Sequence, residues 1–333
     1  MLRARGLGMN GHAGHFPRAA QLRRNGWVVG TFVVLALMLL YERVIHSTAF
    51  GAYDMQSLVD PSVSLALAAM AQAAVVLAGG IDLSIGSQMS LANVIAANWM
   101  VNAGIGDALA ISAALLLGGA LAGAATGLVI THSRVPDIIV TLATGAIWGG
   151  LALQIMPTPG GGVPQDFANL LTGDVRGSGF PVGFVVLALA LLLVWFPLRF
   201  SRPGLAIYAL GSNRTAAYLS GVNVGRTRVI AYAVGGMFAV LGGLTLTAQT
   251  LNGAASSGAT FTLQSVAAIV IGGVALTGGR GGMVGPIAAA FILTLLGTLL
   301  GYLNVDPSWG LVIQGVVMVG AVMVGGLLLR RRK

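Results

Sequence analysis

The chain has 333 residues, of which 56% are hydrophobic and only 8% charged, and its mean hydropathy is +0.88. Soluble domains carry about a quarter charged residues, so this composition excludes a soluble globular protein. The absence of cysteine excludes disulfides and thiolate chemistry. The only lysine is Lys333, the last residue, so the chain cannot supply the phosphate-binding lysine of a Walker A loop.

The apolar runs predict an all-α integral membrane protein. They have the length of membrane helices and lack the alternation of membrane strands. We expect about ten transmembrane helices, some of them discontinuous, with both termini in the cytoplasm. The 50 glycines fit such a bundle, because small residues let membrane helices approach closely. The expected spans are residues 27–45, 62–80, 85–102, 108–131, 137–155, 183–200, 228–250, 261–276, 283–302 and 309–329.

The basic segment 1–26 is expected to form a cytoplasmic tail ahead of the first span. A cleaved signal peptide is the alternative, because residues 46–52, HSTAFGA, resemble a small-residue cleavage site. The length of the basic region and the spans that follow favour an uncleaved first helix. Residues 27–329 then form a single transmembrane domain, and residues 330–333 form a basic cytoplasmic C-terminus.

The arginines set the expected orientation. When the N-terminus is placed inside and the ten spans alternate, every positive charge except Arg43 and Arg176 falls on the inner side. This distribution is a strong positive-inside signal. The net charge of +9 therefore indicates membrane orientation, and it does not indicate affinity for nucleic acid.

Residues 75–92, VVLAGGIDLSIGSQMSLA, predict a helix break. Gly79 and Gly80 end one helix, and a second helix begins just after Asp82, whose carboxylate is placed to accept the first amide hydrogens, those of Ser84 and Ile85. One interpretation is ordinary capping. The other is a discontinuous segment that lines a translocation path, with Ser84 and Gly86 on its small, polar face.

Two long connections follow. The outer loop, residues 156–182, is rich in proline and glycine and is expected to form a shaped, partly rigid lip on the periplasmic side. The largest inner loop, residues 199–228, contains the polar stretch GSNRTAAYLSGVNVGRTR. Asn213 is expected to cap a short helix that Gly221 ends, about 12 Å long and unable to span the membrane. This helix is either a solvated connector held to anionic lipid by its arginines or a docking element for a cytoplasmic partner.

Residues 267–290 repeat the pattern of apolar helix, glycine break and new helix. Gly278, Gly279 and Gly282 form this second break, and the loose echo of residues 73–97 suggests an internal duplication. The interior of the spans holds few titratable groups, whereas ion-coupled carriers need them. Its polar groups are neutral, Gln72, Asn93 and Thr247 among them. Such side chains either line a path for a polyhydroxylated solute or bond helices to one another.

Four motifs occur in order along the chain: GGIDLSIGS, SRVPDIIVTLAT, RPGLAIYALGSNRTAAYLSGVNVGRTR and AAIVIGGVALTGGRGGMVG. Together they resemble the permease subunits of ribose-type sugar ABC importers, a family shared with branched-chain amino acid permeases. The resemblance runs from about residue 55 to 325. It implies a ten-helix permease of the bacterial inner membrane that translocates a monosaccharide, a ribose-like pentose or a hexose.

The resemblance also implies the partners. A second permease subunit, forming a homodimer, two cytoplasmic ATP-binding subunits and a periplasmic solute-binding protein would complete the importer. ATP would be used by the partner subunits, so this chain would bind no cofactor or metal and have no enzymatic activity of its own. The open alternatives are a permease for a branched-chain amino acid or another small solute, and an ion-coupled secondary carrier.

The resemblance further assigns a coupling helix, which would sit in a groove of the ATPase. Its residues are Asn213, Arg214, Thr215, Ala216, Ala217, Tyr218, Leu219, Ser220 and Gly221. The family commonly reads Gly-Asn-Glu-Ala-Ala here, whereas this chain has an arginine at position 214. An acidic residue suits the first turn of a helix and an arginine does not. We therefore expect a matched ATPase with an acidic groove.

Overall fold

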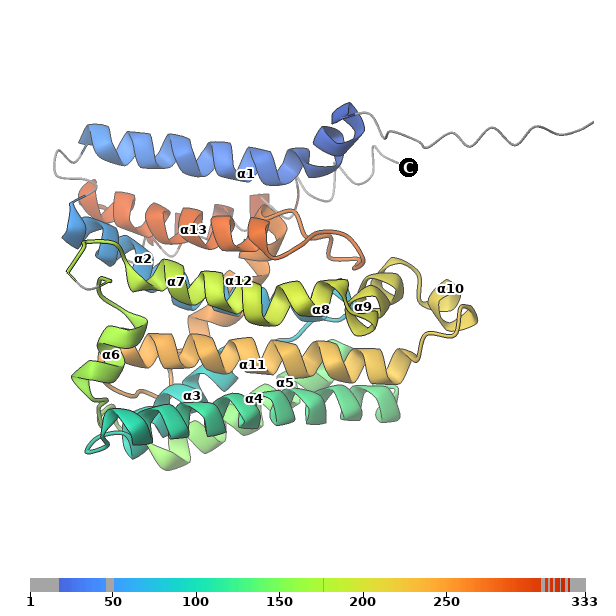
Figure 1. Ribbon diagram of the computed structural model, residues 1–333, viewed down its shortest axis with the longest axis horizontal. Coiled ribbons are helices and arrows are strands. Elements are labelled where there is room, and N and C mark those ends of the chain that lie inside the picture. Colours follow the sequence, from blue (N-terminus) through green and yellow to red (C-terminus); the bar gives the residue numbers. More distant parts are fainter. Residues whose placement is uncertain are drawn as a thin grey trace, which may run out of the picture.

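A computed structural model of the protein describes residues 18–45, 51–175, 177–306 and scattered positions between 309 and 323. Every regular element in these ranges is a helix, and the only extended pairings there are two isolated bridges, Gly160 with Gly253 and Asp174 with Pro181. The predicted all-α class is therefore confirmed. The long helices lie side by side with their axes nearly parallel (Figure 1).

Seven helical segments of the described ranges are long and apolar enough to cross a membrane. The chain is thus built as a multi-pass membrane protein. The segments are Gly26–Ile45 within α1 (Arg18–Ile45), α2 (Ala52–Leu77), α4 (Ile105–Ser133), α5 (Asp137–Ile155), Val182–Phe200, α11 (Val224–Thr250) and α13 (Val284–Tyr302). The segment Val182–Phe200 consists of α7 (Val182–Leu189), the π-helical turn η1 (Ala190–Trp195) and α8 (Phe196–Phe200).

Two further apolar helices are short. The helix α3 (Ile85–Trp99) has 15 residues and α12 (Ala259–Ile271) has 13. At 1.5 Å per residue they are about 20 Å long, which is less than the hydrocarbon core of about 30 Å. Each lies next to a glycine-rich break, as the sequence predicted for discontinuous helices. The tenth predicted span, residues 309–329, lies largely outside the described residues.

The helix α2 is the centre of the bundle. Of its most apolar window, 89% is buried inside the molecule, against 11% for α1 at the periphery (Figure 1). A helix that is apolar all round suits a position with neighbours on every side, and α11, α12 and α13 all pack against it. It begins ten residues before the predicted start at residue 62, so its partly exposed first turns include Asp54 and the helix continues through Pro61.

A seam of glycines joins α4 to α11 in the most extensive helix–helix contact of the described ranges. Gly119, Gly123 and Gly127 recur every fourth residue, so they share one face of α4. A Cβ atom on Gly127 would lie 2.9 Å from the Cα atom of Val229, and one on either of the others would meet the backbone of α11 as closely. Only glycine permits this approach, which accounts for part of the glycine content.

Short helices occupy the two ends of the bundle. The helix α6 (Gln165–Leu171) lies in the loop 156–182, which thus contains regular structure in addition to its proline turns. At the opposite end lie α9 (Arg202–Ser212) and α10 (Arg214–Leu219), and α10 projects beyond the long helices (Figure 1). The two long connections therefore mark opposite ends of the molecule.

Candidate functional site

The helix α10 stands where the sequence predicted a short polar helix. The Oδ1 atom of Asn213 accepts a hydrogen bond from the amide of Ala216 at 3.0 Å, and Gly221 takes a left-handed conformation with φ of +83°. These are the N-terminal cap and the C-terminal stop that the sequence indicated. Tyr218 and Leu219 are 70% and 78% exposed. Two large apolar side chains of this short helix are therefore available for contact with another molecule.

The first break lies between α2 and α3. The helix α2 ends at Leu77, Gly79 follows with φ of +83°, and α3 begins at Ile85. Asp82 is fully buried, and its Oδ1 atom accepts hydrogen bonds from the amide and the hydroxyl of Ser84 at 2.8 and 2.6 Å. The predicted bond from the amide of Ser84 to Asp82 is therefore confirmed. Asp82 does not cap α3, however, because Ser84 occupies the N-cap position, and its side chain makes no capping bond to the first turn of the helix.

The second break is longer than predicted. The helix α12 ends at Ile271, five residues before the expected end at 276, and α13 begins at Val284. The early end is local, because Gly273 takes a left-handed conformation with φ of +81° and the amide of Val274 donates to the carbonyl oxygen of Ile269 at 2.8 Å. A Cβ atom on Gly272 would also collide with the backbone of Gly285 at the start of α13. Gly278 and Gly279 lie between, in left-handed conformations with φ of +87° and +69°, which favour glycine.

The two breaks meet at Gly211, in the last turn of α9 and three residues before α10 begins. The amide of Gly279 donates a hydrogen bond to the carbonyl oxygen of Leu77, the last residue of α2, at 3.0 Å. A Cβ atom on Gly278 would lie 2.9 Å from the Cα atoms of both Gly79 and Gly211. We call Gly79, Gly211, Gly278 and Gly279 the glycine node. It brings both breaks and the root of α10 into direct backbone contact.

Side chains of α9 strengthen this junction. The hydroxyl of Tyr208 donates to the carbonyl oxygen of Gly281 at 3.0 Å, and the hydroxyl of Ser212 donates to that of Gly279 at 3.4 Å. Burial raises the pKa of the Tyr208 phenol, and the guanidinium of Arg199, 4.6 Å from the ring centre, opposes that rise. The hydroxyl therefore remains a donor at neutral pH. The helix α9 is thus tied to the second break as well as to α10.

A buried polar cluster supports the first break from the other side. Asp137 at the start of α5 forms an ion pair with Arg228 of α11 at 3.3 Å, and both side chains are 14% exposed. The hydroxyl of Tyr232 lies 3.1 Å from Asp137 Oδ2 and 3.3 Å from the carbonyl oxygen of Ile81, so it can donate to either. A Cβ atom on Gly80 would lie within 2.8 Å of the carboxylate of Asp137 and the hydroxyl of Tyr232. We call Asp137, Arg228 and Tyr232 the polar lock.

The sequence contains only a partial signal for the polar lock. Asp137 is one of the few carboxylates near the ends of the spans, and such groups are functional candidates by default. Its partners come from a helix about 90 residues further along the chain, so no local pattern connects them. The proximity of Gly80 to this cluster needed the three-dimensional structure.

Comparison with known proteins decides the family. Residues 54–322 match the family described as branched-chain amino acid transport system / permease component. The chain belongs to this family. The ribose import permease of Escherichia coli strain K12 is 32% identical over 297 residues, which cover 87% of this chain and 91% of the relative. No solved structure matches the chain.

Two further relatives of the permease carry other sugar names. The galactose/methyl galactoside import permease of Haemophilus influenzae is 32% identical over 274 residues, which cover 78% of this chain and 81% of the relative. The fructose import permease of Rhizobium meliloti is 30% identical over 294 residues, which cover 85% and 81%. This permease is therefore similar over most of its length to permeases named for three different monosaccharides.

Not every glycine or serine predicted to line a path lies at the node. The amide of Gly86 donates to the hydroxyl of Thr262 at 3.2 Å, which fixes α3 against α12. Ser84 is fully buried between Asp82 and the amide of Gln88. Gly282 has no atom within 4 Å of a built Cβ position. These three residues of the permease therefore lie outside the glycine node. The other residues predicted to line the path belong to the node or lie next to it in the first break.

Some neutral polar side chains of the permease bond one helix to another. Asn93 of α3 donates to the hydroxyl of Thr247 at 2.9 Å, and its Oδ1 atom accepts from Ala254 and Ser257 at 2.8 and 3.0 Å. It thereby holds the loop after α11 against α3. Gln72 differs, because it is fully buried on α2 and neither amide atom has a hydrogen-bond partner among the described residues. Of the two interpretations of these groups, helix bonding holds for Asn93.

Proposed function

We propose that the chain is the membrane-spanning subunit of an ABC importer for a monosaccharide, a ribose-like pentose or a hexose. The names of the ribose, galactose and fructose permeases support this solute class. The subunit would act as a homodimer of ten-helix chains in the bacterial inner membrane and would bind no ATP itself. Cytoplasmic ATPase subunits would hydrolyse ATP, and a periplasmic binding protein would deliver the sugar.

The orientation follows from charge. The end of the bundle that carries α9 and α10 also carries Arg214, Arg226 and Arg228, and membrane proteins keep such residues inside. The helix α10 would then face the ATPase, which would contact its exposed Tyr218 and Leu219. The loop 156–182 and α6 would face the periplasm and the binding protein.

The observation that carries the proposal is the glycine node. A displacement of α10 must move Gly211, and the backbone of Gly211 touches both breaks. Side chains would absorb such a movement, whereas backbone in van der Waals contact transmits it. Closure of the ATPase dimer would therefore tilt α3 and α13 together and open a central path to one side and then to the other. Gln72, buried and unbonded on the central helix, is the neutral group we assign to the passing sugar.

The test is reconstitution of the chain with the ATPase and binding protein encoded beside its gene. We expect ATP hydrolysis that rises with one sugar of a panel of pentoses and hexoses and stays at the basal rate with leucine. Stimulation by leucine alone would contradict the sugar assignment and leave the importer class intact. Uptake that persists without ATP and collapses with an uncoupler would contradict the importer class itself.

A further inference from the structure

A groove opens between α4 and α11 at the end of the bundle that carries α10. Its volume is about 590 Å³, within the range of small-molecule sites. The glycine seam of α4 explains its position. The next residue on the seam face after Gly127 is Thr131, and a Cβ atom on Gly225 would lie 2.9 Å from the Thr131 methyl carbon. The small-residue contact ends here, and the groove opens beside it.

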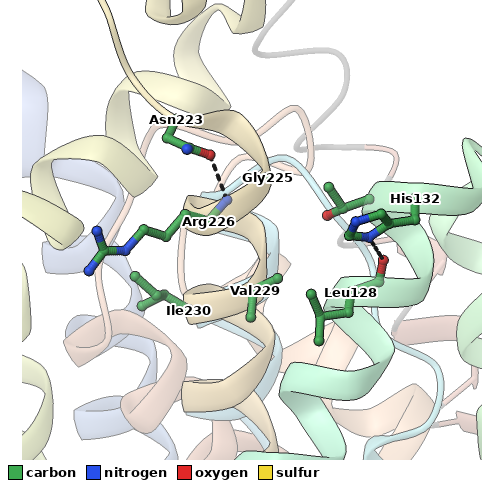
Figure 2. A pocket seen from close by; sticks show the side chains of 8 residues that line it. Leu128, His132, Asn223, Gly225, Arg226, Val229 and Ile230 are labelled. Atoms are coloured by element: carbon green, nitrogen blue, oxygen red, sulfur yellow. Dashed lines mark hydrogen bonds between the residues drawn. The ribbon is translucent and has the colours of Figure 1, made fainter.

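The groove has an apolar interior and a basic rim. Leu128, Val229 and Ile230 line its walls, and Arg226 and His132 stand at its edge. Figure 2 shows Arg226 and Ile230 on one side and Leu128 and His132 on the other. No lining residue is acidic. The groove is therefore complementary to a molecule with an apolar portion and an anionic group.

The positive charge of the rim is available. Arg226 is exposed, and the nearby carboxylate of Asp137 is already paired with Arg228. Arg134 follows α4 directly and is exposed as well. The rim therefore keeps a net positive charge without any bound partner.

The depth of these groups matches a phospholipid. His132 and Arg226 lie within two residues of the ends of their membrane-spanning helices, whereas Leu128 and Ile230 lie four residues further in. At 1.5 Å per residue the apolar walls are about 6 Å deeper than the rim. Phospholipids place their phosphate at the surface and their acyl chains at this greater depth. Basic pockets between membrane helices on the cytoplasmic side are known to suit anionic headgroups.

We propose that this groove binds one anionic phospholipid of the inner leaflet. Its phosphate lies at the basic rim beside Arg226, and the first part of an acyl chain lies along Leu128, Val229 and Ile230. The leaflet rests on the proposed orientation, but the site itself does not. A docked ATPase is a poorer match, because the walls belong to membrane-spanning helices and α10 already offers exposed apolar side chains. The bound lipid braces the start of α11, five residues after α10 ends.

The experiment places the full-length chain in nanodiscs of mixed phosphatidylglycerol and phosphatidylcholine. Native mass spectrometry then measures which of the two lipids the released protein retains. The wild type should retain phosphatidylglycerol in preference. Arg226→Gln should lower its affinity about fivefold, the effect of one arginine near an anionic surface. Leu128→Trp should lower retention of the lipid by filling the groove without changing its charge. Arg202→Gln, an exposed arginine at the same end but outside the groove, is the matched control and should have no effect.

Three outcomes would overturn the proposal. They are equal retention of both lipids by the wild type, no loss in either groove variant, and displacement of the lipid by soluble glycerol phosphate, which would assign the site to a free anion. If Arg226→Gln left lipid retention unchanged but weakened co-purification of the ATPase in detergent, the groove would be a protein-docking surface. None of these readouts depends on sugar or on ATP hydrolysis, so they are independent of the proposed transport function.

Discussion

Gly278 and Gly282 lie four residues apart in the same break, yet their surroundings differ completely. Gly278 has φ of +87°, and a Cβ atom there would lie 2.9 Å from two backbone Cα atoms of the node. A Cβ atom on Gly282 would meet nothing within 4 Å. Both residues belong to the same glycine-rich stretch, so the local sequence does not explain the difference and the three-dimensional contacts do. It also offers a matched pair of substitutions.

We expect Gly278→Ala to destabilise the protein by about 1–3 kcal/mol, since a non-glycine residue in this conformation is strained and the backbone has no room to yield. The same change should abolish sugar-stimulated ATP hydrolysis in the reconstituted complex. Gly282→Ala should stay within about 0.5 kcal/mol of the wild type. Thermal unfolding in detergent and the stimulated hydrolysis rate are the measurements. Equal behaviour of the two variants would argue against the node.

The polar lock gives the second prediction at this scale. Asp137→Ala leaves the guanidinium of Arg228 largely buried without its counter-charge, and removal of one partner of a buried ion pair costs about 3–5 kcal/mol. We expect a clear fall in the thermal unfolding midpoint. The double variant Asp137→Leu, Arg228→Met removes both charges and should recover much of the loss. A double variant as unstable as the single one would show that the pair itself is not the source of the effect.

At the scale of elements, Asn213 and Asn223 form a natural comparison. Each caps a helix through its Oδ1 atom, Asn213 for α10 and Asn223 for α11, with hydrogen bonds of 3.0 and 2.9 Å. The helix α10 has six residues, whereas α11 has 27 and packs along α4 and α2. Short helices in water depend on their caps, and packed helices depend on their contacts.

We therefore expect Asn213→Ala to weaken association with the ATPase and to lower stimulated hydrolysis, because loss of a cap worth about 1 kcal/mol unfolds much of α10. Asn223→Ala removes an equivalent bond but should leave both quantities close to wild type. Co-purification of the tagged permease with its ATPase measures the first quantity. If the two variants weakened association equally, α10 would not be the coupling element.

Arg214 tests the match between this helix and its partner. An arginine in the first turn opposes the helix dipole, so its presence has to be explained by something outside the helix. We expect Arg214→Glu to weaken co-purification with the cognate ATPase, because a glutamate would face an acidic groove. Arg214→Gln, which removes the charge without reversing it, should give a smaller loss. Unchanged or tighter association of the glutamate variant would rule out the acidic groove.

The sequence predicted best those elements whose ends are set locally. The helix α5 occupies the predicted residues 137–155, and α10 has the predicted cap and glycine stop. The ends of α2 and α12 were predicted wrongly. The first turns of α2 contain Asp54 and Pro61 and stay partly exposed, so hydropathy does not mark them as part of the helix. The end of α12 was missed although its signal is local, because Gly273, with φ of +81°, stands within an apolar run.

The candidate site shows the same division. The sequence identified both breaks and the short helix, since glycine pairs and caps are local signals. It did not predict that Gly211 joins them, or that Gly80 lies against Asp137 and Tyr232. These contacts link residues separated by more than 50 positions. Three of the four node glycines were predicted as site residues individually, but their assembly was not.

On the scale of the whole molecule, burial decreases from the centre of the bundle outward. The central helix α2 ends at the node, so the most buried helix is the one that shares backbone contacts with the root of α10. The peripheral helix α1 contacts mainly α13 (Figure 1). A movement that enters at α10 thus reaches the core of the permease before it reaches the lipid-facing helices.

The proposed orientation is the last feature to test, and the absence of cysteine makes the test direct. Ser178 in the loop 156–182 and Ser220 after α10 are both exposed and lie at opposite ends of the bundle. A single cysteine at Ser178 should react with a membrane-impermeant maleimide in right-side-out vesicles, and one at Ser220 only in inverted vesicles. The cysteine-free parent is the blank in both preparations. Reversed labelling would place α10 outside, where no ATPase could reach it. Labelling of both cysteines from one side would show that Val182–Phe200, the candidate span between them, does not cross the membrane.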